Sequence, residues 1–129
     1  MSTEGRALAL AVHAGAFERV HYALVMASAA AAIGRSAVLF FTGEAVRALV
    51  DWQDLPGAEQ DARLVARGVA GFEELLEACR ELGVRFIACE MALRAAGLRA
   101  EELRTDLPIE VAGVVTFLEA ASDGQLLFI

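Results

Sequence analysis

The sequence contains no lysine: all 11 of its basic residues are arginine. This absence excludes Schiff-base chemistry, a lysine general base and the Gly-x-x-x-x-Gly-Lys phosphate loop. Acidic residues outnumber basic ones by 18 to 11, which gives a formal net charge of −7. Because an acidic chain is poorly suited to bind nucleic acid or an anionic membrane surface, we expect neither as a partner.

Cysteine and proline are also scarce, with two of each in 129 residues. Two cysteines do not make a disulfide framework, and no cysteine and histidine cluster has metal-site spacing, so we expect no metal ion and no other cofactor. No targeting signal is evident, and the longest stretch without a charge, 20–34, is too short to span a membrane. We therefore expect a soluble cytoplasmic protein.

Hydrophobic residues are abundant: they make up 57% of the chain, against 22% for charged residues. These proportions are typical of a folded globular protein, and the length is that of one domain. Since neither a linker nor an internal repeat is evident, we expect residues 1–129 to form a single domain. The apolar share is high for a monomer, which indicates that part of the surface is covered by another subunit.

Apolar runs and helical periodicities alternate along the chain and predict strands and helices in turn. Strands are expected at 6–12, 36–41, 84–88, 109–112 and 125–129. Helices are expected at 17–33, 44–50, 72–82, 90–96, 99–104 and 114–121. The segment 51–71 is the least periodic, and we interpret it as a long loop, with room for one helical turn, that serves as a lid or a partner surface.

Helices that alternate with strands predict an α/β fold with a mostly parallel sheet covered by helices on both faces. Ligands of such sheets bind at the carboxyl ends of the strands. The predicted strand ends carry polar, small or reactive residues. These are His13, Thr42 with Gly43, Cys89, and Gly113.

The two cysteines have different predicted roles. Cys79 lies on the apolar stripe of the helix at 72–82 and is interpreted as a core residue. Cys89 follows a strand and precedes the helix at 90–96: either it merely fills space at the strand end, or the first N–H groups and positive potential of that helix favour its thiolate. Glu90 acts in the opposite sense if it lies near the sulfur, or else complements the helix dipole. The two sulfurs are expected roughly 10 Å apart along the sheet, too far for a disulfide.

Four other polar features have competing interpretations. His13 is either a turn residue or a group that faces the same crevice as Cys89. His21 is expected at the surface or in an interface, and Trp52 either packs on its own domain or anchors a partner. The glutamates between 73 and 77 are interpreted as a solvated helix face.

The segment around Cys89, GVRFIACEMALRAAGL at 83–98, resembles the cysteine-bearing strand and helix of the DsrE/DsrF and TusD proteins, the YchN-like sulfur-relay family. Further segments resemble the first βαβ unit of that family and its last strands and helix. They are 8–12, 19–32, 34–41, 107–121 and 126–128. The resemblance covers nearly the whole chain apart from 51–71, and the order and spacing of the segments carry it.

This resemblance implies a three-layer α/β/α fold with a five-stranded parallel sheet, and assembly into a homo-trimer or homo-hexamer. It implies that Cys89 is the catalytic residue, which holds a persulfide and passes its outer sulfur between donor and acceptor proteins, TusA-like or similar. Sulfur oxidation and tRNA thiolation are the pathways in which the family works. The residues that would form a supporting pocket around the cysteine are His13, Thr42, Gly43, Glu90 and Gly113.

Two other functions stay open at this point. One is a non-catalytic oligomeric binding module for a small ligand or a partner protein, which the acidic segment 51–71 and the apolar surplus favour. The other is a thiol peroxidase, which needs an arginine and a threonine or serine beside its cysteine. Arg85 precedes Cys89 by four residues and is therefore expected at the opposite end of the strand.

Overall fold

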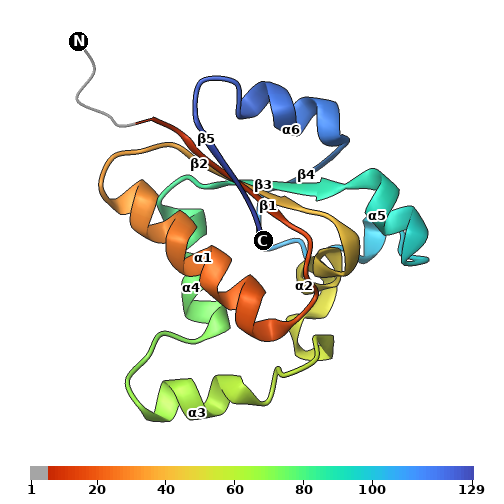
Figure 1. Ribbon diagram of the computed structural model, residues 1–129. Coiled ribbons are helices and arrows are strands. Elements are labelled where there is room, and N and C mark those ends of the chain that lie inside the picture. The colour runs from red at the N-terminus through yellow and green to blue at the C-terminus, as the bar shows by residue number, and fades with distance from the viewer. Residues whose placement is uncertain (1–5) are drawn as a thin grey trace.

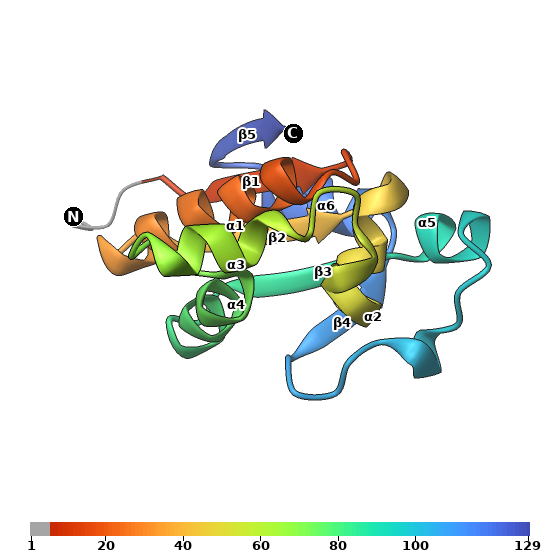
Figure 2. The same ribbon diagram turned by 90° about the horizontal axis from the view of Figure 1, so that it is seen from below.

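The computed structural model describes residues 6–129, so the first five residues of the predicted domain lie outside the described residues. Its centre is a five-stranded parallel sheet in the order β4-β3-β2-β1-β5 (Figure 2). The strands are β1 (Leu8–Val12), β2 (Ala37–Phe41), β3 (Arg85–Cys89), β4 (Ile109–Ala112) and β5 (Gln125–Phe128). The predicted α/β fold with a five-stranded parallel sheet is confirmed.

Helices connect the strands and cover both faces of the sheet, so that the fold has three layers: helices, sheet and helices (Figure 1). The α-helices are α1 (Phe17–Ala32), α2 (Ala48–Asp51), α3 (Gln60–Ala66), α4 (Phe72–Glu81), α5 (Glu90–Ala95) and α6 (Val114–Ala120). Short 3₁₀ helices are η1 (Gly43–Arg47), η2 (Trp52–Asp54) and η3 (Ala100–Glu102). Within the described part of the chain, no helix is both long enough and apolar enough to cross a bilayer.

The two faces of the sheet are distinguished by the side chains of β2, which alternate between them. Phe40 stacks on Phe117 of α6, with ring centroids 4.8 Å apart, and so marks the α6 face. Phe41 points to the opposite side, the α1 face, where it stacks with Phe86 of β3. All residues of β1 and β2 are buried, because central strands covered on both faces need apolar side chains at every position.

The α1 face is covered by α1 and α4, which pack against each other. The buried residues of α1 fall at helical spacing and include Phe17, Leu24 and two buried alanines of the central turns, Ala23 and Ala27. Because alanine is small, the two helices approach closely: the Cys79 sulfur of α4 lies 3.7 Å from the Leu24 carbonyl oxygen of α1. This close packing is what the alanine-rich composition provides.

The segment 51–71 is the main error of the sequence-based prediction, because it is not a long loop. It contains η2 and α3, and the sequence pattern misses α3 because this helix has no buried residue and hence no apolar stripe. Contacts with Phe72 hold the 51–71 segment in place: Trp52 stacks on the Phe72 ring at 4.9 Å, and Asp61 accepts a hydrogen bond from the Phe72 backbone N–H.

Two further helices are shorter than predicted: 44–50 forms η1 followed by α2, and 99–104 contains only η3.

Candidate functional site

The carboxyl ends of neighbouring strands bring the predicted site residues to one edge of the sheet. Because the strand order is β4-β3-β2-β1, the residues that end or follow these strands form a row in the same order. This row consists of Gly113, Cys89 with Glu90, Thr42 with Gly43, and His13. The edge predicted from the strand ends therefore exists in the structure.

Cys89 lies between two neighbouring strands. On one side it pairs in register with Ala112 of β4. On the other side Phe41 pairs with Ala88, so the next residue of the β2 chain, Thr42, lies beside Cys89. Thr42 keeps an extended backbone, with φ −129° and ψ 178°, and its N–H continues the ladder to β1. The alternation of side chains directs both Thr42 and the Cys89 thiol to the α6 face.

The same cysteine is the N-cap residue of α5, with the extended backbone that this position requires. Its side chain is enclosed, since only 3% of the residue is exposed. Of the helix that begins beside it, α5, only Ala92 and Leu93 are buried, and Met91 is 72% exposed.

His13 belongs to the same edge but does not adjoin Cys89, because the end of β2 lies between them. Its ring stacks on Phe128 at 5.5 Å. On the other side it presses against Gly43, where an added Cβ would lie 2.8 Å from the His13 ring atoms Cδ2 and Nε2. The imidazole is therefore clamped between β5 and the start of η1.

Glu90, the first residue of α5, is exposed and lies on the β4 side of Cys89. Its carboxylate oxygen Oε1 is 3.8 Å from the point where a Cβ on Gly113 would stand. A carboxylate at the first turn of α5 complements the positive end of the helix. Glu90 and Gly113 thus close the row on the β4 side, opposite His13.

Cys79 is separate from this row. It is fully buried in the interface of α1 and α4, and burial raises the pKa of its thiol to about 12. Both cysteines are free, and the prediction that Cys79 is a core residue is confirmed.

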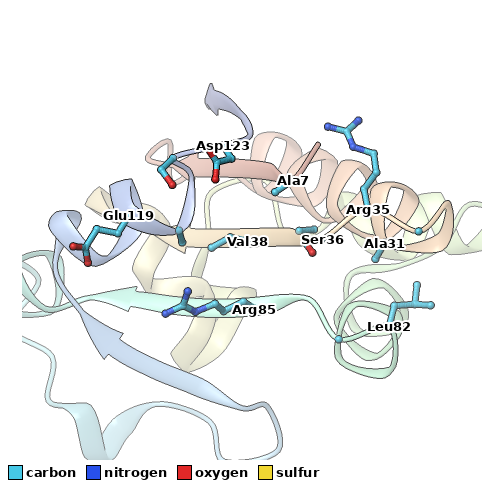
Figure 3. Close-up of a pocket in the computed structure, with 14 residues that line it drawn as sticks. Ala7, Ala31, Arg35, Ser36, Val38, Leu82, Arg85, Glu119 and Asp123 are labelled. Atoms are coloured by element: carbon cyan, nitrogen blue, oxygen red, sulfur yellow. The ribbon is translucent and has the colours of Figure 1, made fainter. Parts of the chain in front are cut away.

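Arg85 lies at the amino end of β3, the end opposite Cys89, as expected from the sequence. It borders a hollow of about 720 Å³ at the amino ends of the strands (Figure 3). Its guanidinium donates two hydrogen bonds to Glu110, at 2.6 and 3.1 Å. Arg35, which borders the same hollow, donates to the Arg6 carbonyl and to Gln125. Because Arg85 is remote from the thiol, the arginine of a thiol peroxidase site is not supplied by this residue.

Sequence reasoning missed an ion-pair network beside η2. Arg104 donates two hydrogen bonds of 2.8 Å to Glu73 and further bonds of 2.7 and 2.6 Å to Asp106. Trp52 donates its indole N–H to the same Glu73 carboxylate at 2.7 Å. These bonds to Arg104 lower the pKa of Asp106 to about 2 and lower that of Glu73. No sequence signal links Glu73 with Arg104, since 31 residues separate them.

His21 was expected at the surface or in an interface, and this is wrong for the single chain: only 8% of the residue is exposed. Its ring packs against Phe17 at 5.5 Å, and Nε2 lies 2.9 Å from the Ala70 carbonyl oxygen. A signal was available, because His21 follows Phe17 by four residues and precedes Leu24 by three, which places all three on one helix face. The carbonyl that it binds comes from the distant end of the 51–71 segment.

Two solved structures define the class of fold. One is MTH1491 from Methanobacterium thermoautotrophicum, a protein of unknown function, with a TM-score of 0.62 and 16% identity over 97% of this chain and 100% of that chain. The other is the ychN protein from E. coli, with a TM-score of 0.62 and 15% identity over 95% of this chain and 97% of that chain. At these identities the likeness shows the fold alone.

The family follows from the sequence match. Residues 7–128 match the DsrE/DsrF-like family, and the chain belongs to it. A curated relative, the sulfur carrier protein DsrE2 of Allochromatium vinosum, is 24% identical over an alignment 156 positions long, which spans 95% of this chain and 97% of that protein. The family resemblance recognised in the sequence is confirmed.

Proposed function

We propose that this protein is a small sulfur carrier that holds a persulfide on Cys89 and passes the outer sulfur to a partner protein. The observation that carries the proposal is the position of Cys89, at the carboxyl end of β3 and at the N-cap of α5. Membership of the DsrE/DsrF-like family and the relative described as a sulfur carrier support it.

The proposed chemistry is two thiol exchange steps. The Cys89 thiolate attacks the outer sulfur of a donor persulfide, so that a new S–S bond forms while the donor S–S bond breaks and the donor leaves as a thiolate. A thiolate of the acceptor protein then attacks the terminal sulfur on Cys89, and the Cys89 thiolate leaves in turn. Neither step needs an oxidant or a reductant, because each forms and breaks one S–S bond.

The neighbours of Cys89 supply groups that suit such a step. The first-turn N–H groups of α5 have no partner within the helix and favour an anion on the residue before them. In this proposal the hydroxyl of Thr42, which directly follows the neighbouring strand β2, donates a hydrogen bond to the thiolate or to the persulfide anion. His13 and Gly43 contact each other on the β1 side of Cys89, and Glu90 and Gly113 border Cys89 on the β4 side.

Access to the thiol requires a local opening, because Cys89 is only 3% exposed. In this proposal the element that moves is α5, which begins beside Cys89 and buries only Ala92 and Leu93. The alkylation rate of Cys89 is then set by the opening of α5 and rises in mild urea well below the concentration that unfolds the chain.

We propose that the protein also assembles with copies of itself, as a homo-trimer or homo-hexamer, through a surface on the α6 face. This surface, called the α6–β5 surface below, is made of exposed apolar side chains of α6 and β5. They are Val114, Val115, Leu118, Leu126 and Phe128. The register of β5 with β1 and β2 places Leu126 and Phe128 on the same face as Phe40, which packs under α6. Contiguous exposed apolar surface of this kind is typical of an interface.

The proposed partners are sulfur donor and acceptor proteins, TusA-like or similar, and the proposed location is the cytoplasm. Two free cysteines and no disulfide among the described residues fit a reducing compartment.

The decisive experiment is intact mass spectrometry after exposure of the protein to glutathione persulfide. Wild type and a Cys79→Ala variant are expected to gain about 32 Da, the mass of one sulfur, whereas Cys89→Ser is expected to gain nothing. Transfer is then followed by the loss of this mass on addition of a thiol acceptor protein. Equal labelling of Cys89→Ser and wild type would overturn the proposal.

Thr42→Val provides a finer test of the site. It keeps the shape of the side chain and removes only the hydroxyl, so the fold should be retained. If the hydroxyl stabilises the anion, the rate of persulfide formation should fall by about fivefold, as expected for loss of one hydrogen bond. An unchanged rate would remove Thr42 from the mechanism.

A further inference from the structure

A second hollow lies on the α1 face, away from the face to which the Cys89 thiol points. Its volume of about 640 Å³ lies within the range of small-molecule pockets. Apolar walls come from three parts of the chain: Phe17 and Met26 of α1, Leu64 of α3, and Ile129 after β5. We call it the α1–α3 hollow.

His21 lines this hollow and is the one polar residue that is buried among those the structure describes. Its Nε2 lies 2.9 Å from the Ala70 carbonyl oxygen. A carbonyl oxygen can only accept, so Nε2 must carry the hydrogen and donate it. In the neutral ring the other nitrogen, Nδ1, is then an acceptor with a free lone pair.

Nδ1 has no hydrogen-bond partner within the described chain. Because no described side-chain nitrogen or oxygen is both fully enclosed and unpaired, Nδ1 must reach open space. The hollow that His21 lines offers that space. Water can donate to Nδ1 while the hollow is open, but a ligand that fills the hollow displaces that water and must then supply a hydrogen-bond donor of its own.

The rim of the hollow limits the charge of such a ligand. Glu18 and Arg19 border it with opposite charges, and the remaining polar groups there, Tyr22 and Gln60, are neutral. The opposite charges of Glu18 and Arg19 offset each other, so the rim does not favour an anion, and the lone pair of the unprotonated Nδ1 repels a carboxylate. A neutral donor, a hydroxyl, suits the site better.

The walls favour an aromatic body. Three of the residues that line the hollow carry rings, Phe17, His21 and Tyr22, and Met26 adds a thioether, a group that contacts aromatic rings favourably. The opposite wall, α3, has no buried residue, so it can adjust around an occupant without disturbing the core.

We propose that the α1–α3 hollow binds a small phenol, whose hydroxyl donates to His21 Nδ1 and whose ring lies against Phe17, Met26 and Leu64. The site is independent of the sulfur-carrier proposal, because no residue of the Cys89 row lines it.

The first experiment titrates the full chain with three probes of similar size: p-cresol, 4-methylanisole and toluene. Only p-cresol has a hydroxyl donor, so it is expected to bind at least about fivefold more tightly than the other two. A long-range ¹H–¹⁵N spectrum reads His21 directly: the free protein shows hydrogen on Nε2, and p-cresol moves the Nδ1 resonance to lower frequency. Equal affinity for the three probes, or no saturable shift at millimolar p-cresol, overturns the proposal.

Variants then locate the site. Leu64→Trp fills the hollow from α3 and is expected to abolish p-cresol binding, whereas Ala66→Trp, on the exposed side of the same helix, retains it. His21→Gln keeps an N–H that can reach the Ala70 carbonyl but loses Nδ1, so p-cresol should bind it no better than 4-methylanisole. If Leu64→Trp binds p-cresol as well as Ala66→Trp does, the ligand lies elsewhere and the proposal fails.

Discussion

Trp52 and Glu73, 21 positions apart, are joined by a 2.7 Å hydrogen bond from the indole N–H to the carboxylate. The same carboxylate accepts two hydrogen bonds from Arg104, which also binds Asp106. Three segments, η2, the start of α4 and the stretch before β4, therefore meet at Glu73. This junction fixes one end of the 51–71 segment to the body of the protein.

The first prediction concerns Glu73→Gln. The substitution removes the charge that Arg104 pairs with while leaving an oxygen for the Trp52 N–H. We expect the free energy of unfolding to fall by about 1 kcal/mol, because the pair is partly exposed. Thermal unfolding followed by circular dichroism should show a midpoint about 3 °C lower. Glu74→Gln, on the neighbouring exposed carboxylate, is the control, and an equal effect in both variants would contradict the assigned role.

The second prediction is a dependence of stability on acid pH. The hydrogen bonds from Arg104 hold the pKa of Asp106 at about 2, below its ordinary 3.8, and lower that of Glu73 from 4.5. A carboxyl whose pKa is lower in the folded state stabilises the fold above its unfolded pKa, and this contribution is lost as pH falls towards the folded pKa. Urea unfolding should therefore show stability declining from pH 4.5 to 2.

Arg104→Met should flatten that decline, because both carboxyl groups then titrate nearly alike in the folded and unfolded states. Arg63→Met, on exposed α3, serves as the control and should keep the wild-type slope. A parallel decline in the two variants would mean that other groups cause the acid sensitivity.

The sheet and its carboxyl edge could be predicted because both depend on local sequence. The runs LALAV and AVLFF are apolar throughout, which strands buried on two faces require, and the residue after each strand then lies at the edge by geometry alone. Thus Cys89, Thr42 and His13 were correctly expected along one edge. Their order, with Thr42 between the other two, depends on the strand order, which the sequence did not specify.

The features that were missed depend on contacts between distant residues or on the absence of burial. α3 carries no apolar stripe, so no periodicity reveals it. The Arg104 network joins residues up to 31 positions apart. The burial of Cys89, which is only 3% exposed, is likewise a tertiary effect that the sequence pattern did not reveal.

The third prediction concerns Gly43, which has φ +53° and lies against the His13 ring. Gly43→Ala places a Cβ 2.8 Å from the ring and from the His13 carbonyl oxygen, in addition to the strain of the left-handed backbone. We expect it to cost about 2 kcal/mol or more. Gly34→Ala, with φ +90° and open space around it, carries only the backbone strain and is the matched control. Urea unfolding of the two variants isolates the contact with His13, and equal losses would mean that this contact is unimportant.

The fourth prediction tests the α6–β5 surface. Phe128→Glu places a charge at the one aromatic residue of this surface, which is 70% exposed, so the fold itself should tolerate the change. We expect sedimentation velocity to show a shift from the assembled form to the monomer. Ile33→Glu, at a residue 73% exposed beyond the end of α1, is the matched control and should leave the assembly intact. A wild-type chain that is monomeric, or equal effects of the two variants, would exclude this interface.

The fifth prediction concerns alkaline pH and the buried thiol of Cys79. Burial raises the pKa of this thiol from 9.0 to about 12, so between these values the folded chain holds a proton that the unfolded chain has lost. A group whose folded pKa is raised stabilises the fold fully below its unfolded pKa, and this stability is lost as pH rises. The free energy of unfolding should therefore decline above pH 9. Cys79→Ala lacks the titrating group, so although it starts from a lower stability, it should lose less between pH 9 and 11. Urea unfolding across this range checks the difference in slope, and parallel curves for Cys79→Ala and wild type would show that the thiol is not enclosed as the contact with Leu24 indicates.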